Sequence, residues 1–372
     1  MSRGYCQINF KGKYKVEKRI HEIIKLHQQF WSGETMDSPL VSFKIAPDYF
    51  FSTHFKASRA LLIPGKEITP DMIDVDEFIK DYQKAADEID AVDQDGFWTA
   101  EPFVGFPWME AICGCKVYAT ESSYISHHCL SGIEEYEKII FDSENPWFKK
   151  YMEFTVKLFK EFKGRYFIGQ PILRGMSDVV GALIGQTEMI YTMYDYPEEV
   201  KKLMSRIADI FLHIIKSQQD AIEPLYGGYS MGFYHLWSPG RCMWFQEDLT
   251  SLMSPDQYRE FLAEQHEKIL SCYDYTGIHL HSSSFHVLED LLSLERLKVI
   301  EINKDIGGLT VEQMMPVFKR VQQKGKKLMV WGDLNNEEID MIKNNLDMKG
   351  LHFNIIAPGV PEAVKLLEHI RK

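Results

Sequence analysis

Histidine and carboxylate side chains gather near the ends of two predicted strands in the last third of the sequence. His279 and His281 alternate in "GIHLHSS", and Glu301 and Asp305 alternate in "LKVIEINKD". Alternate residues of a strand share a face, so each pair points to one side. A histidine beside a carboxylate is a typical general acid/base or metal ligand. We therefore take His281 as the main catalytic candidate, with Glu301 or Asp305 to orient it.

A metal site is a second interpretation of the same residues. His281 and His279, with a carboxylate from Glu301 or Asp305, offer the nitrogen and oxygen ligands that zinc accepts, and His281 and Glu301 are the first metal candidates. Two histidines at positions i and i+2 of a buried strand, however, lie ~6.5–7 Å apart along it. Spacing alone therefore favours a polar, ligand-binding strand end over a metal site.

The elements that would position these residues alternate regularly between strands and helices. From residue 41 onward, short β-branched or aromatic runs alternate with amphipathic helical stretches, which predicts an α/β fold with a parallel sheet. Four clear strand–helix units after residue 276, with about four earlier ones, fit a (β/α)₈ TIM barrel. A doubly wound sheet is the alternative, but no "GxGxxG" or "GxxxxGK[ST]" loop follows a strand. We expect residues 1–40 to form a helical segment packed on a barrel of residues 41–372.

In such a barrel the active site collects at the carboxyl ends of the strands. Earlier predicted strands include "GFWTAEPFVG", "RYFIGQPI" and "GGYSMGFYHLW". Together with the loops that follow them, these strand ends yield a set of expected substrate-binding residues. The set is Trp98, Glu101, Arg174, Asp178, Tyr229, His235, Trp237, Arg241, His279, Ser283 and Asp333.

Several stretches of the sequence keep two interpretations each. In "RGMSDVVGALIG", a helix N-terminus beside Arg174 could hold an anionic group, or Arg174 and Asp178 could simply pair across the loop. "WSPGR" and "FQEDLTSLMSP" resemble a lid, with Trp237 either a stacking wall or a hydrophobic plug. "CGC" at Cys113–Cys115 has no second cysteine pair nearby in the sequence, which favours structural burial over a metal site.

Composition excludes several classes of partner. The net charge of −12 argues against nucleic acid or an anionic membrane as the main partner. No stretch approaches the ~18 apolar residues of a membrane span, and the charged N-terminal stretch does not resemble a signal peptide. The six cysteines form no recognisable disulfide framework. We expect a cytoplasmic protein that acts on a small molecule, and the oligomeric state stays open, with a homodimer among the options.

Four stretches, in this order, together resemble the uroporphyrinogen decarboxylase superfamily. They are "FVGFPWMEAICGCKV", "GMSDVVGALIGQTEMIYTMYDYPEEVKKLM", "EDLTSLMSPDQYREFLAEQHEKI" and "IHLHSSSFHVLEDLL". The resemblance covers most of the chain from about residue 40 and implies the same (β/α)₈ barrel. The superfamily includes the tetrapyrrole decarboxylase and zinc- and corrinoid-dependent methyltransferases.

The sequence departs from both branches at their characteristic motifs. Where the decarboxylases carry an arginine-rich stretch of the type "RQAGRY", this chain has "LVSFKIAPDYFFSTHFKASRALL", with Arg59 alone. The methyltransferases hold zinc through His-x-Cys and a later cysteine. The first falls on His281 and Ser283, and "FNIIAPGVPEA" contains no cysteine. A serine hydroxyl is a poor substitute for a thiolate ligand, so any zinc site would have to be rebuilt from other residues.

The resemblance implies methyl transfer between a small organic substrate and a corrinoid such as methylcobalamin. No corrinoid-binding "DxHxxG" stretch is present in the sequence, so the corrinoid would be carried by a partner protein. One alternative is a metal-free decarboxylase in which Arg174 or Arg241 holds a carboxylate and His281 protonates the carbanion. A barrel that binds a tetrapyrrole or another small ligand without turnover is the third interpretation.

Overall fold

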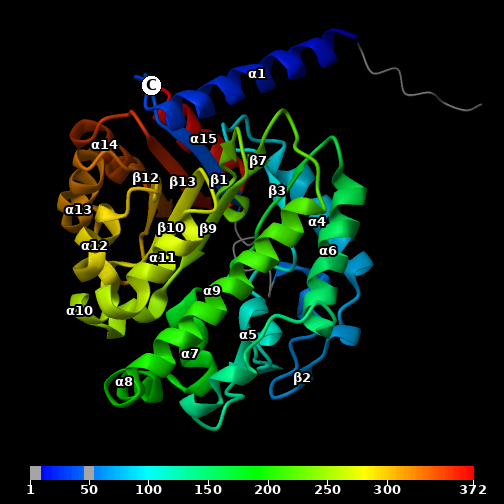
Figure 1. The fold of residues 1–372 in the computed structure, drawn as a ribbon. Coiled ribbons are helices and arrows are strands. Elements are labelled where there is room, and N and C mark those ends of the chain that lie inside the picture. Colours follow the sequence, from blue (N-terminus) through cyan, green and yellow to red (C-terminus); the bar gives the residue numbers. More distant parts are fainter. Residues whose placement is uncertain (1–9, 46–53) are drawn as a thin grey trace, which may run out of the picture.

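Six parallel strands form the central sheet of the computed structural model, which describes residues 10–45 and 54–372 and, for residues 10–18, the helical backbone only. Their order is β1-β13-β12-β11-β10-β9 (Figure 1). Almost every residue of these strands is buried, as expected when both faces of a parallel sheet are covered. The strands are β1 (Leu40–Ile45), β9 (Cys242–Gln246), β10 (Tyr275–Leu280), β11 (Val299–Asn303), β12 (Lys327–Gly332) and β13 (Leu351–Ala357).

Two further parallel strands, β3 (Thr99–Ala100) and β6 (Phe167–Ile168), pair with each other. A few hydrogen bonds connect the segments that flank β3 and β6 to the edges of the large sheet. The Asp95 amide donates to the Val41 carbonyl at 2.8 Å, and the Gly175 amide donates to the Gln246 carbonyl at 2.8 Å. The α/β class with a parallel sheet is therefore confirmed. The described pairings comprise a sheet of six strands and a pair of two, without a continuous eight-stranded ladder.

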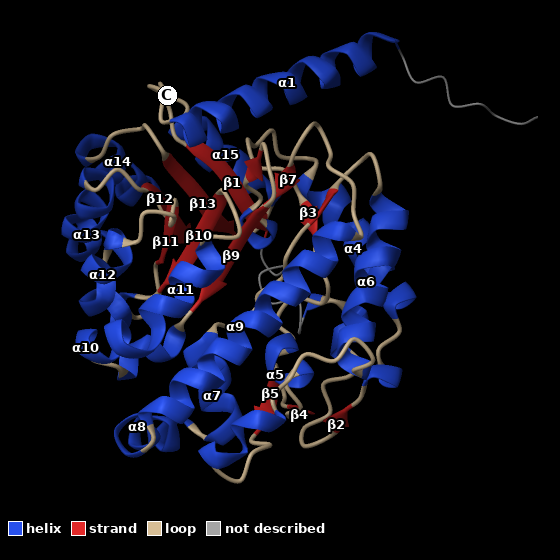
Figure 2. Cartoon of the chain, in the orientation of Figure 1, coloured by secondary structure: helices blue, strands red, loops and turns tan. Residues whose placement is uncertain are grey.

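Helices cover the outside of these strands (Figure 2). Helix α9 illustrates why: Val200, Leu203, Met204 and Ile207 recur at helical spacing and are all buried. The longer helices are α1 (Phe10–Ser32), α4 (Val75–Ile89), α6 (Pro146–Phe162), α7 (Met176–Ile184), α8 (Gln186–Asp195), α9 (Pro197–Asp220), α11 (Ala263–Leu270), α13 (Val311–Gln323), α14 (Asn336–Asn345) and α15 (Val360–Ile370). Short ones are α3 (Lys56–Arg59), α5 (Trp108–Ile112), α10 (Pro255–Gln257) and α12 (Leu288–Ser293).

Capping contacts fix the start of several helices. The Asn145 side chain accepts the amide hydrogens of Trp147 and Phe148 at the start of α6. Ser254 and Gln257 form a capping box at the start of α10. Such contacts satisfy amide groups that have no partner within the helix. They also stop each helix at a defined residue.

Small antiparallel elements complete the fold away from the sheet. The β4–β5 hairpin (Lys116–Ala119 and Tyr124–His127) also pairs with β2 (Glu67–Ile68). Strands β7 (Tyr229–Ser230) and β8 (Trp237–Ser238) pair with each other, and α1 packs against β8. Trp31 of α1 donates its indole N–H to the Trp237 carbonyl at 2.6 Å. The prediction of a "WSPGR" lid is therefore wrong, because Trp237 is buried beneath the N-terminal helix.

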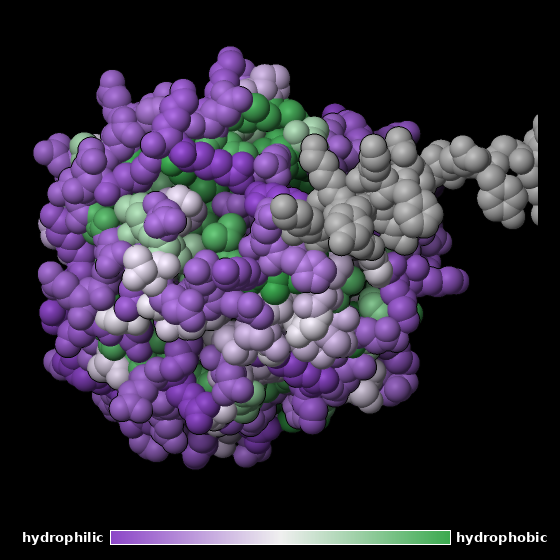
Figure 3. Space-filling view, turned by 90° about the horizontal axis from the view of Figure 1, so that it is seen from above, coloured by the Kyte–Doolittle hydropathy of each residue, from purple (hydrophilic) through white to green (hydrophobic). Residues whose placement is uncertain are grey.

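The exterior is largely polar. In the view from above, hydrophilic residues dominate the described surface, with smaller apolar areas between them (Figure 3). No helix in the described ranges combines the length and apolar character that crossing a membrane requires. The expected boundary between residues 40 and 41 stays a prediction, and residues 1–9 of that segment lie outside the described residues.

Candidate active site

A cavity of about 270 Å³ lies at the carboxyl edge of the central sheet. One wall is aromatic: the rings of Phe233 and Trp331 lie 5.3 Å apart, and those of Tyr234 and Trp244 lie 4.7 Å apart. The other lining residues include polar side chains from strand ends and from α5, so an apolar ligand body and a polar group can be bound together. The polar lining residues are Glu110, Ser123, Arg174, Gln246, His279, His281 and Asn303.

The two histidines meet at the end of β10. His279 belongs to the strand, whereas His281 follows its last residue, so the two side chains are not held parallel. Their Nε2 atoms lie 2.9 Å apart and their rings are almost perpendicular, with an interplanar angle of 89°. The expectation of a wide separation between them is therefore wrong, because it assumed a regular strand through His281.

Each histidine is held from behind by a carboxylate. Glu301 lies opposite His279 in the β10–β11 register and accepts a hydrogen bond from its Nδ1. Asp305 accepts one from His281 Nδ1 at 2.6 Å. An ionised carboxylate can only accept, so both Nδ1 atoms carry the hydrogen. Each Nε2 atom is then the position where the ring can bind a proton or a metal ion.

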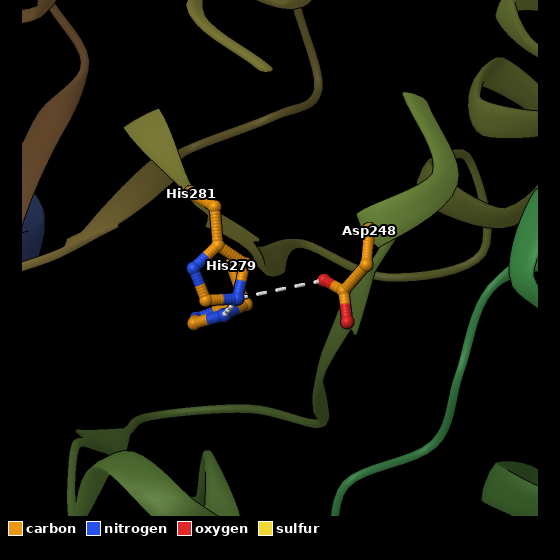
Figure 4. Close-up of side chains that lie close together, drawn as sticks. All are labelled: Asp248, His279 and His281. Atoms are coloured by element: carbon orange, nitrogen blue, oxygen red, sulfur yellow. Dashed lines mark hydrogen bonds and ion pairs between the residues drawn. The ribbon is translucent and has the colours of Figure 1, made fainter. Parts of the chain in front are cut away.

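Asp248 completes the cluster from the neighbouring strand. It lies two residues after the end of β9, and its Oδ1 lies 3.7 Å from His281 Nε2 (Figure 4). One ligand atom from each of Asp248, His279 and His281 lies within 4.8 Å of the others. Gln246 donates to Asp248 Oδ2 at 2.9 Å, which leaves Oδ1 directed to the histidines.

A buried network fixes the backbone at Asp248. Asp178 accepts the amide hydrogens of Asp248 and Leu249 at 3.2 and 2.8 Å. The neighbouring Glu247 accepts the amides of Met176 and Ser177, each at 2.8 Å, at the start of α7. Burial, followed by the nearby charges of Asp248 and Glu247, raises the pKa of Asp178 well above its usual value.

The three side chains fit a divalent metal ion. At 2.9 Å, either one protonated ring donates its Nε2–H to the other Nε2, or both nitrogens bind the same metal ion. Zinc at ~2.0–2.1 Å from two tetrahedrally arranged nitrogens sets them ~3.3 Å apart, which is close to the 2.9 Å between the two Nε2 atoms. Two histidines and one carboxylate with open positions are also typical of catalytic zinc and non-haem iron sites. Burial opposes protonation of His279, but the Glu301 carboxylate outweighs it and raises the pKa of His279.

The structure brings together the residues predicted from the two strand ends, with one change of role. His279, His281 and Arg174 line the cavity. Glu301, expected as a metal ligand, lies behind His279 and also accepts from the Tyr234 hydroxyl at 3.1 Å. Asp248 takes the place of the expected carboxylate ligand.

Arg174 has a different partner from the one expected. Its Nη1 donates to Glu110 Oε1 at 2.8 Å, rather than pairing with Asp178. The N-terminus of α7 does not serve an anionic ligand either, because the Glu247 carboxylate already accepts its amides. Both interpretations of that loop are therefore wrong. Arg174 nevertheless lines the cavity.

Trp98, Glu101 and His235 lie in the interior, outside the cavity. Trp98 packs in the core against Phe162 and Tyr166. His235 has left-handed backbone geometry and lies 3.1 Å from Lys44 through its Nε2. Burial raises the pKa of Glu101 to about 8, although Lys44 acts to lower it. Their places near strand ends in the sequence do not put their side chains in the ligand space.

The remaining expected residues lie elsewhere in the structure. Tyr229 lines a separate small cavity, and Arg241 pairs with Asp220 at 2.7 Å. Ser283 is exposed in the turn after His281. Asp333 is exposed and pairs with Lys304 at 3.3 Å. With Arg241 away from the cavity, the decarboxylase alternative keeps only Arg174 as a cation for its substrate.

Sequence reasoning missed Asp248, Glu110 and most of the aromatic wall. Asp248 was missed because it was assigned to the lid stretch "FQEDLTSLMSP", and "CMWFQ" was not recognised as strand β9. Its aromatic and apolar residues before an acidic pair were the signal available. Glu110 lies in a short helix after Pro107, and nothing in its neighbourhood marks it.

Fold and site together define the class of this protein: it is an α/β protein with a parallel sheet and a histidine–carboxylate cluster at the carboxyl edge of that sheet. No family model and no curated protein matches the chain. Fifteen chains of solved structures match it in fold. One is a methyltransferase from Methanosarcina mazei, with a TM-score of 0.60 and 12% sequence identity over 93% of this chain and 98% of that chain. At this identity the likeness shows the fold alone.

Proposed function

We propose that this protein is an enzyme that transfers a methyl group between a small organic substrate and a corrinoid carried by a separate protein. His279, His281 and Asp248 would hold a divalent metal ion, with zinc as the first candidate. The observation that carries the proposal is the pair of Nε2 atoms facing each other at 2.9 Å while both Nδ1 atoms are bound to carboxylates. Similarity in fold to a methyltransferase supports the type of reaction.

The metal would polarise an oxygen, sulfur or nitrogen atom of the substrate and stabilise its negative charge as the methyl group leaves or arrives. Glu301 and Asp305 would keep each Nε2 directed to the metal, and Gln246 would do the same for Asp248. In the alternative without a metal, His281 is the residue that would hold or deliver the proton.

The rest of the cavity would bind and orient the substrate. The rings of Phe233, Tyr234, Trp244 and Trp331 would pack against its apolar body and exclude water. Arg174, held by Glu110, would bind an anionic group through its remaining N–H donors. This wall and Arg174 together favour a small substrate that is partly apolar and carries a negative or polar end.

We further propose that β3 and β6 close the ring with the six-stranded sheet to form a (β/α)₈ barrel of residues 41–372, preceded by the segment 1–40. The hydrogen bonds from Asp95 to Val41 and from Gly175 to Gln246 lie at the two junctions where closure is required. A barrel gathers its strand ends around one mouth, where the cavity and the metal ligands lie.

The reaction is tested with the zinc-loaded full chain and methylcobalamin as the probe. A panel of small thiols, phenols and amines is added, and the visible spectrum reports loss of the methyl–cobalt bond. We expect one class of acceptor to consume methylcobalamin in the presence of the protein. His281→Ala should abolish this activity, whereas His369→Ala, which removes a partly exposed histidine paired with Asp340, should not.

If the protein binds methylcobalamin but no acceptor of the panel causes loss of the methyl–cobalt bond, the interpretation as a non-catalytic binding protein is supported. Turnover that persists in the His281→Ala variant would contradict the assignment of the site.

A further inference from the structure

A pair of cysteines lies close together outside the cavity. Cys115 Sγ lies 3.6 Å from Cys129 Sγ, and both are free cysteines. Cys115 also donates to the Ala182 carbonyl of α7 at 3.7 Å, and Cys129 donates to the Cys113 carbonyl at 3.9 Å. The sequence had suggested only that the "CGC" stretch was buried, because Cys129 is distant from it along the chain.

The β4–β5 hairpin brings these two residues together. Lys116 lies opposite His127 in its antiparallel register, so Cys115 and Cys129 follow at its open end. Gly114 has φ of +104°, a conformation that L side chains rarely adopt, and it turns the chain between α5 and β4. On the other strand, the amides of Cys129 and Leu130 both donate to the Leu183 carbonyl. Both sulfurs are therefore held in place by the surrounding backbone.

The two sulfurs differ in exposure and in charge. Cys129 is exposed, whereas Cys115 is buried. The hydrogen bond from Cys115 lowers the pKa of the Cys129 thiol, and the same hydrogen bond, followed by burial, raises that of Cys115. Cys129 is the accessible sulfur with the larger thiolate fraction, and the thiolate is the form that attacks a disulfide. Cys115 is placed to resolve a mixed disulfide formed there.

We propose that Cys115 and Cys129 are a dithiol site that accepts oxidising equivalents from a small-molecule disulfide and closes to an intramolecular disulfide. Cys129 thiolate attacks one sulfur of glutathione disulfide, its S–S bond breaks, and one glutathione thiolate leaves. Cys115 then loses its proton and attacks Cys129 Sγ, which releases the second glutathione. Two protein thiols and one glutathione disulfide thus yield one protein disulfide and two glutathione thiols.

The new bond would constrain one wall of the catalytic cavity. A disulfide holds its sulfurs ~2.05 Å apart, so the pair must approach by only ~1.6 Å. The chain between them is the hairpin, which contributes Ser123 to the cavity and Tyr124 to a second cavity beside Arg174 and Asp248. The proposal does not depend on methyl transfer, because the dithiol lies outside the metal cluster.

The test uses the reduced full chain in buffers that range from reduced to oxidised glutathione. After unreacted thiols are alkylated in denaturant, we expect the six thiols of the chain to fall by two. Trypsin cleaves after Lys116, so one peptide of residues 85–116 should be linked to one of residues 117–138. Fragmentation of the first peptide distinguishes Cys115 from Cys113. The linked protein should melt several degrees higher than the reduced protein, because the bond restricts the unfolded chain.

Control variants separate this pair from the other cysteines. Cys272→Ser removes another exposed thiol and should lose the same two thiols on oxidation. The Cys129→Ser variant should not lose two thiols on oxidation. In the Cys115→Ser variant the reaction should end at a mixed disulfide between Cys129 and glutathione. Circular dichroism of each reduced variant establishes that it is folded. A bond that maps to Cys113, an equal loss of two thiols in Cys129→Ser, or no loss in fully oxidised buffer would overturn the proposal.

Discussion

Replacing Glu301 with glutamine should weaken metal binding without removing any ligand. Glu301 is 1% exposed and accepts hydrogen bonds from His279 Nδ1 and the Tyr234 hydroxyl. Glutamine keeps the shape and a carbonyl acceptor but loses the negative charge that makes His279 a stronger ligand. Loss of such a supporting carboxylate typically costs 10–100-fold in metal affinity, which is about 1.4–2.8 kcal/mol.

The assay is a competition titration of zinc between the metal-free full chain and a chromophoric chelator. Glu289→Gln is the matched control, because Glu289 pairs with Arg320 on the surface and should leave zinc affinity unchanged. The melting temperature of both variants is measured alongside, to establish that each is folded. A folded Glu301→Gln variant that binds zinc as tightly as the wild type would refute the supporting role of Glu301.

Three further outcomes follow from the same geometry. Burial raises the pKa of Glu101 to about 8 from 4.5, so the folded state keeps a proton that the unfolded chain loses. The free energy of unfolding should therefore fall by up to about 1.4 kcal/mol per pH unit between pH 4.5 and 8. Urea titrations of the Glu101→Gln variant should lack this fall. An identical pH dependence in the variant and the wild type would contradict the raised pKa of Glu101. Arg174→Met should raise the KM for an anionic substrate ~10-fold or more, whereas Arg241→Met should leave this KM unchanged. Equal effects of the two substitutions would show that Arg174 does not bind the substrate. Trp331→Ala should weaken binding of apolar ligands in calorimetry, and unchanged affinity would place the ligand elsewhere.

The fold was most predictable where strands are long and helices carry caps. The units from β10 to α15 combine runs of buried β-branched residues with helices that have clear starts, such as the capping box at Thr310. The two-residue strands β3 and β6 are too short for a periodic pattern, so their predicted extents were too long. A strand end located only within several residues cannot tell which side chains face the mouth. This explains why Trp98 and His235 were wrongly expected there.

Part of the candidate site could be predicted from the sequence, namely the residues at two strand ends. The alternation of His279 with His281, and of Glu301 with Asp305, identified two neighbouring strand ends from sequence alone. Which carboxylate completes the cluster depends on the third strand, β9, and on a turn held by Asp178 about seventy residues earlier. Such long-range contacts leave no periodic trace in the sequence. The close approach of Cys115 to Cys129 through a hairpin was inaccessible for the same reason.

The proposed metal site is the cluster of His279, His281 and Asp248. Its most direct test is the metal content of the full chain, determined by mass spectrometry after zinc loading and extensive desalting. The wild type should retain about one zinc per chain, and a His279→Ala/His281→Ala variant that remains folded should retain almost none. A wild type with no more zinc than this variant would contradict the account.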